Sequence, residues 1–113
     1  MLRIYHNARC KKSREGLEIL KNSGKEFEIK EYLKEPLSEN ELADLIKKLD
    51  ITPIQLVRKN EKIWKEDYKD KDLSDKELIT VMVKNPKLIE RPVVETERKA
   101  VIGRPPSNID KLL

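Results

Sequence analysis

The stretch that decides the fold is residues 3–14, RIYHNARCKKSR. It begins with strand-forming residues, passes through a polar turn at Asn7 and reaches Cys10, after which helical spacing begins. Four cationic side chains lie between Arg9 and Arg14, on both sides of the cysteine. A thiol at the start of a helix among cations is expected to have a lowered pKa and a large thiolate fraction at neutral pH.

Cys10 is the only cysteine in the chain, so the chain cannot close a disulfide on its own thiol. A redox cycle at Cys10 would therefore need a second thiol from another molecule. The alternative is a buried structural cysteine, which the strand-turn-helix context and the neighbouring cations make the weaker interpretation. A single cysteine also fits a reducing compartment better than a disulfide-stabilised secreted protein.

Length and composition limit the architecture and the partners. The chain has 113 residues, of which 37% are hydrophobic and 41% charged, so we expect one domain with a small core. The 25 Lys and Arg exceed the 21 Asp and Glu only slightly, and the signs alternate, which fits a small anionic substrate better than nucleic acid. No apolar run approaches membrane-spanning length. We expect a cytoplasmic protein with no membrane or nucleic-acid partner.

Outward from the opening stretch, periodicity and end signals predict a strand, a helix and a second strand. These elements are expected over residues 2–5, 11–22 and 26–32, and the pair Ser23-Gly24 ends the helix. A strand, a helix and a strand within about thirty residues predict a parallel, right-handed crossover.

Residues 38–88 are predicted to be an all-helical insertion. Three helices within it have N-terminal capping signals, which begin at Ser38, Thr52 and Ser74. Residues 60–72 are rich in lysine and weakly patterned, and they predict a short helix or loop whose lysines face solvent. Trp64 in this segment is expected to pack onto the core.

The C-terminal part predicts a hairpin and a last helix. Two short strands, 91–95 and 100–102, flank a polar turn, and a helix follows the break at 103–107. The complete order of elements resembles that of the thioredoxin-like fold. We therefore predict a single α/β domain of the three-layer thioredoxin-like type, with a four-stranded mixed sheet. Its core comprises residues 1–37 and 89–113, and the insertion comprises residues 38–88.

Two residues near Cys10 are candidates for tuning the thiol. Ser13 stands where many proteins with this order of elements have a second cysteine; a hydroxyl there can cap the helix or hydrogen-bond the thiolate but cannot resolve a disulfide. His6, the only histidine, can act on the thiol by charge or through the turn, or it can simply pack against the sheet. One cysteine and one histidine do not make a zinc site, so we predict no metal.

Two Arg-Pro pairs are the second informative feature. Arg91-Pro92 precedes the hairpin and Arg104-Pro105 follows it, so both arginines are predicted at the same end of the hairpin. A guanidinium binds a tetrahedral oxyanion in a planar, bidentate manner, and two of them favour an anion site over ordinary surface positions. By analogy with the thioredoxin-like order, we expect Pro92 to be cis and to face Cys10.

Together these residues resemble the glutaredoxin-coupled arsenate reductase family. The stretches that carry the resemblance occur in family order at residues 6–14, 31–33, 56–60, 89–94 and 103–105. The chain departs from the family at Ala8, where proline is usual, and at Lys11 and Lys12, where a small pair is usual.

The resemblance implies an oxidoreductase that reduces arsenate to arsenite with Cys10 as nucleophile. It also implies three oxyanion-binding arginines, Arg58, Arg91 and Arg104, with His6 and Ser13 as supporting residues. Glutathione would be the reductant and glutaredoxin the protein partner, with no bound cofactor. Two alternatives stay open: a glutathione-dependent thiol oxidoreductase with another substrate, and a non-enzymatic regulator that binds RNA polymerase. The second alternative would leave the arginines without a use.

Overall fold

Four short strands form one mixed sheet in the computed structural model, which describes residues 2–113. The strand order is β2-β1-β3-β4; β1 and β2 are parallel, and the other neighbours are antiparallel. This arrangement confirms the predicted four-stranded mixed sheet. The strands are β1 (Leu2–Tyr5), β2 (Phe27–Lys30), β3 (Val93–Glu95) and β4 (Ala100–Ile102).

The chain divides into two compact units. The first comprises residues 2–35 and Arg91–Leu113 and contains the whole sheet. The second is Pro36–Glu90, which is helical throughout its regular structure and contains the predicted insertion.

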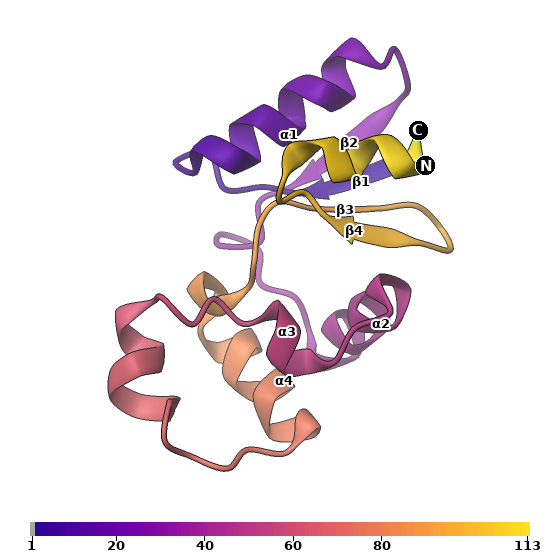
Figure 1. Ribbon diagram of the computed structural model, residues 1–113. Coiled ribbons are helices and arrows are strands. Elements are labelled where there is room, and N and C mark those ends of the chain that lie inside the picture. The colour runs from indigo at the N-terminus through magenta and orange to yellow at the C-terminus, as the bar shows by residue number, and fades with distance from the viewer. Residues whose placement is uncertain (1) are drawn as a thin grey trace. The chain divides into compact units, whose positions relative to one another are not determined.

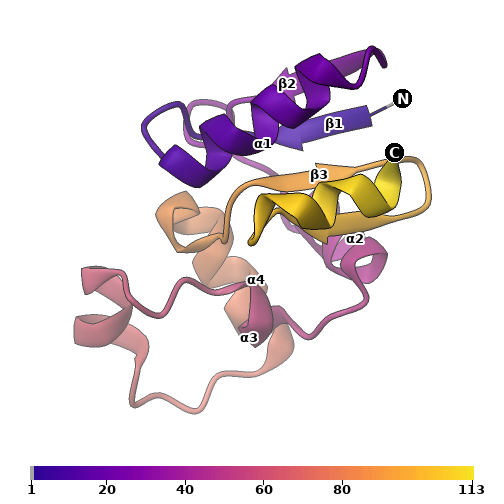
Figure 2. The ribbon, with the colours of Figure 1, turned by 45° about the horizontal axis from the view of Figure 1, so that its top comes forward.

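Two helices of the first unit pack on one face of its sheet, as Figures 1 and 2 show for α1 (Lys11–Asn22) and η3 (Pro106–Leu112). Because side chains alternate along a strand, Leu2 and Ile4 of β1 point to this face. The buried residues that form the core here are Leu2, Ile4, Leu20, Val94 and Ile109. The core thus joins the sheet to both helices and holds α1 against the sheet.

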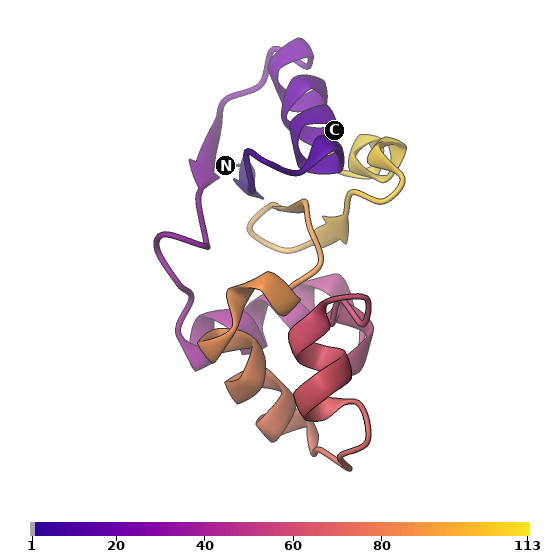
Figure 3. The same ribbon diagram turned by 90° about the vertical axis from the view of Figure 1, so that its left-hand side faces the viewer.

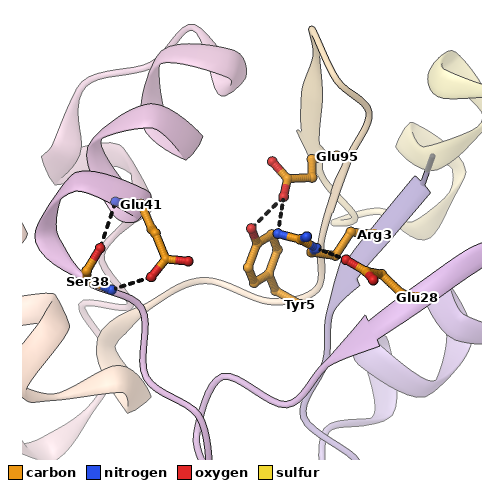
Figure 4. Close-up of polar contacts among 6 residues, drawn as sticks. All are labelled: Arg3, Tyr5, Glu28, Ser38, Glu41 and Glu95. Atoms are coloured by element: carbon orange, nitrogen blue, oxygen red, sulfur yellow. Dashed lines mark hydrogen bonds and ion pairs between the residues drawn. The ribbon is translucent and has the colours of Figure 1, made fainter.

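The alternate residues of β1 form a polar network on the other face of the sheet (Figure 4). Tyr5 donates a hydrogen bond of 2.5 Å to the Glu95 carboxylate, and Arg3 forms ion pairs with Glu95, at 3.4 Å, and with Glu28. Burial and the hydrogen bond to Glu95 raise the pKa of Tyr5. The network links β1 to both of its neighbouring strands through side chains as well as backbone.

The second unit is built around α4 (Asp75–Lys84), which packs against two other helices, α2 (Glu39–Leu49) and α3 (Pro53–Leu56). A single turn of π-helix, η1 (Trp64–Tyr68), and a 3-10 turn, η2 (Pro86–Leu88), complete it (Figure 3). Trp64 is buried, which confirms its predicted packing.

The capping signals at Ser38 and Ser74 form as predicted. Ser38 accepts a hydrogen bond from the backbone of Glu41, whose carboxylate accepts one from Ser38 N–H (Figure 4), and Ser74 with Glu77 repeats this reciprocal pair. Each box satisfies two backbone donors that a helix N-terminus otherwise leaves unpaired.

Three elements differ from the sequence predictions, two in their bounds and one in its type. The second strand ends at Lys30, because residues 31–35 turn back through hydrogen bonds from Lys34 and Glu35 to the Glu31 carbonyl. The third strand begins only at Val93. The C-terminal helix is of the 3-10 type. Among residues 2–113, no helix is both long enough and apolar enough to cross a membrane.

Candidate functional site

The turn before α1 holds Cys10 directly before the helix. Cys10 occupies the N-cap and is partly exposed. The Asn7 carbonyl accepts from Cys10 N–H at 3.0 Å, and the Asn7 side chain accepts from Arg9 N–H at 3.1 Å. Asparagine suits this position because its side chain mimics a backbone turn. Arg14 reaches back from the helix and donates to the Ala8 carbonyl at 3.0 Å, so the turn is tied at both ends.

His6 and Ser13 form a buried pair beneath this turn. Ser13 Oγ accepts from Asn7 N–H at 2.9 Å and lies 2.8 Å from His6 Nδ1. Ser13 Oγ therefore joins the backbone of the turn to the imidazole ring of His6. Burial lowers the pKa of His6, in keeping with a neutral ring. His6 therefore supports Cys10 through the turn and not through a positive charge.

The two arginines of the Arg-Pro pairs converge on the Cys10 sulfur. Arg104 Nη2 lies 3.4 Å from Cys10 Sγ, and its Nε donates to the Arg91 carbonyl at 2.8 Å. The Arg91 side chain also hydrogen-bonds the sulfur. The peptide bond before Pro92 is cis, as predicted, and so is the bond before Pro105. The thiol and two guanidinium groups, which are far apart in the sequence, thus form one cationic site within the first unit.

The Cys10 thiol has a pKa below its ordinary value. Burial acts in the opposite direction and raises the pKa, but it is outweighed by the Ser13 backbone N–H, the Arg91 guanidinium and the Lys12 backbone N–H. The direction agrees with the sequence analysis, whereas the main causes differ. They are helix N–H groups and a distant arginine, and the neighbouring cationic side chains are not among them.

Arg58 belongs to the second unit, so its place relative to Cys10 stays a prediction. The bridge between Val57 and Ile89 fixes its backbone, and Arg58 N–H donates to the Leu88 carbonyl at 2.7 Å. Its Nη1 lies 3.9 Å from the Glu90 carboxylate. Arg58 Nε and Nη1 are buried, and neither has a hydrogen-bond acceptor among residues 2–113. These donors are suited to an anion.

Three residues that shape the site escaped the sequence analysis in this role. Arg14 ties the turn through the Ala8 carbonyl, and the glycines Gly16 and Gly103 both face Pro92. A contact between residues distant in the chain leaves no local periodicity, so only the folded structure identifies the two glycines.

The family model described as the ArsC family matches residues 5–112. The chain belongs to the ArsC family. The model spans both units and includes every residue of the site described above.

Relatives and solved structures in the ArsC family agree with this assignment. The chain is 42% identical over 112 residues to the arsenate reductase of Haemophilus influenzae, covering 97% of each chain. It is 46% identical over 110 residues to YfgD of Escherichia coli K12, an uncharacterised protein, covering 96% of this chain and 92% of YfgD. The solved arsenate reductase of Vibrio cholerae superimposes with a TM-score of 0.94 at 38% identity, covering 99% of this chain and 97% of that one. The predicted thioredoxin-like fold is thereby confirmed.

Proposed function

We propose that this protein is an arsenate reductase in which Cys10 is the nucleophile and Arg91 and Arg104 bind the oxyanion. The observation that carries the proposal is the convergence of both guanidinium groups on a thiol whose pKa is lowered by helix N–H groups and by Arg91, although its burial raises it. Arg58 is the third arginine of the proposal. Its buried Nε and Nη1 have no hydrogen-bond acceptor among residues 2–113. The arsenate reductases among its relatives support the choice of substrate.

The chemistry begins with attack of the Cys10 thiolate on arsenic. A sulfur–arsenic bond forms, and one arsenate oxygen leaves as water after taking up protons. Negative charge concentrates on the remaining oxygens in this step, and the fixed arginines stabilise it more than they stabilise free arsenate. Donors already in place need no reorganisation during the reaction.

An external thiol completes the cycle, because the chain has no second cysteine and Ser13 cannot form a disulfide. Glutathione attacks the Cys10 sulfur, the sulfur–arsenic bond breaks, and arsenic leaves with both electrons as arsenite. Cys10 and glutathione are then joined by a disulfide, which glutaredoxin reduces with its own thiols. We propose the cytoplasm, where thiols are kept reduced, as the place of this reaction.

Glutathione oxidation measured with and without arsenate, in the presence of glutaredoxin, tests the proposal. We expect Cys10→Ser to abolish the arsenate-dependent rate, because serine is not ionised at neutral pH and cannot form the disulfide. We expect Arg91→Ala to raise KM for arsenate about tenfold or more, which corresponds to a lost charge-assisted hydrogen bond of about 1.5–3 kcal/mol.

Arg98→Ala is the matched control, because Arg98 is an exposed arginine in the turn at the opposite end of the β3–β4 hairpin. We expect it to leave KM unchanged. An arsenate-dependent rate that survives Cys10→Ser would refute the proposed function. Arsenate-independent glutathione oxidation with small disulfides, unaffected by Arg91→Ala, would instead favour a thiol oxidoreductase with another substrate.

A further inference from the structure

Two glycines of the first unit lie against the same proline. A Cβ built on Gly16 would lie 2.9 Å from Pro92 Cγ and 3.0 Å from Ile109 Cδ1. A Cβ built on Gly103 would lie 2.8 Å from the same Pro92 carbon and 3.1 Å from the same Ile109 carbon. The two contacts with Pro92 are shorter than real Cβ atoms show, so a side chain at either glycine would force its surroundings to shift. Pro92 and Ile109 are both fully buried, and the pyrrolidine ring is closed onto its own backbone, so it moves less than an open side chain would.

The lack of room for a side chain, and not a backbone conformation that only glycine adopts, explains both glycines. Gly16 lies in the middle of α1, where glycine makes a helix less stable than alanine does. Neither Gly16 nor Gly103 has the positive φ that Gly24 has, so alanine fits both backbones. The helix therefore keeps an unfavourable residue at a point of close contact with Pro92.

Gly16 lies on the face of α1 that leads to the thiol. Ser13 lies three residues from Cys10 and three from Gly16, so it is next to each of them on the helix surface. Ser13 and Gly16 are both buried. How closely α1 approaches Pro92 at Gly16 therefore decides where the sulfur lies at the helix start.

Pro92 in turn connects to both arginines of the site. Arg91 precedes it in the chain, and the Pro92 carbonyl accepts from Gly103 N–H at 2.8 Å. The next residue, Arg104, donates to the Arg91 carbonyl at 2.8 Å. The two Arg-Pro pairs are thus joined by two hydrogen bonds across the hairpin, directly beside the contact with Gly16.

We propose that Gly16 and Gly103 are positioning residues, which allow α1 and the end of β4 to close on Pro92 and thereby set the distance from Cys10 Sγ to Arg91 and Arg104. The inference rests on Cys10 being the reacting thiol of the proposed function. A methyl group at Gly16 separates α1 from Pro92, and the helix start carries the sulfur away from both guanidinium groups. The thiolate then loses stabilisation while its burial is retained.

The test compares Gly16→Ala with the wild-type protein in two measurements. The first is the pH midpoint of Cys10 alkylation by iodoacetamide, without arsenate. We expect the midpoint to rise by about half a pH unit, a roughly threefold loss of thiolate at pH values below the midpoint. The second is KM for arsenate, which we expect to rise while expression and the unfolding transition show a folded protein. Gly103→Ala, which crowds the same Pro92 carbon from the end of β4, is expected to raise KM as well.

The double variant Gly16→Ala with Ile109→Val separates positioning from packing. Valine at 109 lacks the Cδ1 atom that the new methyl would meet, so crowding against η3 is relieved while the contact with Pro92 remains. We expect stability to recover in the double variant and the raised alkylation midpoint to persist. Ile109→Val alone is the matched control, with an altered core and an unchanged midpoint.

An unchanged midpoint and KM in Gly16→Ala would overturn the proposal, and so would a midpoint that returns to the wild-type value in the double variant. If Gly16→Ala alone does not fold, the double variant and Gly103→Ala provide the same readings. Failure of this proposal is distinguishable from failure of the proposed function. If the wild-type protein turns over arsenate but Gly16→Ala shows no midpoint shift, only the positioning role is contradicted. If Gly16→Ala shows a midpoint shift but the wild-type protein does not turn over arsenate, only the proposed function is contradicted.

Discussion

Ser13 performs two tasks with two different groups. Its backbone N–H stabilises the Cys10 thiolate, and its hydroxyl joins Asn7 N–H to His6 beneath the turn. Ser13 is fully buried, so a partner left unpaired there would have no water to replace it. Burial disfavours the protonated imidazole of His6 and lowers its pKa, which makes the turn sensitive to pH.

This sensitivity leads to a prediction for His6. The pKa of His6 is lowered in the folded protein from the 6.5 of a free imidazole, mainly by burial. The unfolded chain therefore binds this proton at a higher pH than the folded chain does. The contribution to stability is complete above about pH 6.5 and is lost as the pH falls toward the folded pKa.

Denaturant unfolding of the wild type and of His6→Gln between pH 5 and 8 measures this effect, over an interval chosen to span the ordinary histidine pKa of about 6.5. We expect the wild-type free energy of unfolding to decrease below about pH 6.5 and His6→Gln to lack this part of the decrease. Parallel pH profiles for the two proteins would show that His6 is not buried as a neutral ring.

At the scale of elements, helix ends are the features that local sequence determines most directly. The capping boxes at Ser38 and Ser74 need only residues within four positions of each other, and both form with side-chain and backbone bonds of 3.0–3.2 Å. In contrast to these caps, η1 is a π-helical turn, in which the rings of Trp64 and Tyr68 stack with their centroids 6.0 Å apart.

Removing one of these caps gives a prediction for α2. Ser38→Ala leaves Glu41 N–H without its side-chain acceptor, and we expect the free energy of unfolding to decrease by about 1 kcal/mol. Asn40→Ala is the control, because Asn40 is exposed in the same helical turn and alanine is the better helix former. Urea unfolding followed by circular dichroism measures both. Equal stability of Ser38→Ala and the wild type would mean that the cap is not formed in solution.

At the scale of the whole molecule, the positive charge is concentrated in the unit that contains the thiol. Residues 2–35 and 91–113 hold 14 Lys and Arg against 9 Asp and Glu, whereas Pro36–Glu90 holds 11 against 12. The excess of five positive charges in the first unit should attract anions toward Cys10 from a distance, beyond the direct contacts of the two arginines.

The salt dependence of alkylation tests this field. The measured quantity is the Cys10 alkylation rate with anionic iodoacetate divided by the rate with neutral iodoacetamide, normalised to the same ratio for free cysteine. We expect this normalised ratio to exceed one at low ionic strength. The ratio should decrease as the Debye length falls from about 30 Å at 0.01 M salt to about 10 Å at 0.1 M. Arg9→Gln, an exposed cation in the turn, should lower the ratio at low salt only. A ratio independent of salt would assign anion attraction to direct contacts alone.

The amino-acid sequence by itself determined the elements and much of the thiol chemistry. The alternation at Leu2–Tyr5, the helical spacing after Cys10 and the serine caps act between residues close in the chain, where geometry follows from local bonding. The Arg-Pro pairs indicated an anion site, and the structure brings Arg91 and Arg104 to the sulfur. Arg58 was found by its motif alone, and its role stays a prediction.

Only the tertiary structure decided what lowers the thiol pKa and how closely Gly16 and Gly103 approach Pro92. The contributions of Arg91 and the close contacts of Gly16 and Gly103 with Pro92 join residues that are between 11 and 81 positions apart. Such contacts depend on how β1, α1 and the hairpin pack around one core, and packing leaves no periodic trace in the chain. A glycine in the middle of a helix is in sequence terms only a weak helix former, and its use is visible only where the Pro92 ring occupies the space of its missing side chain.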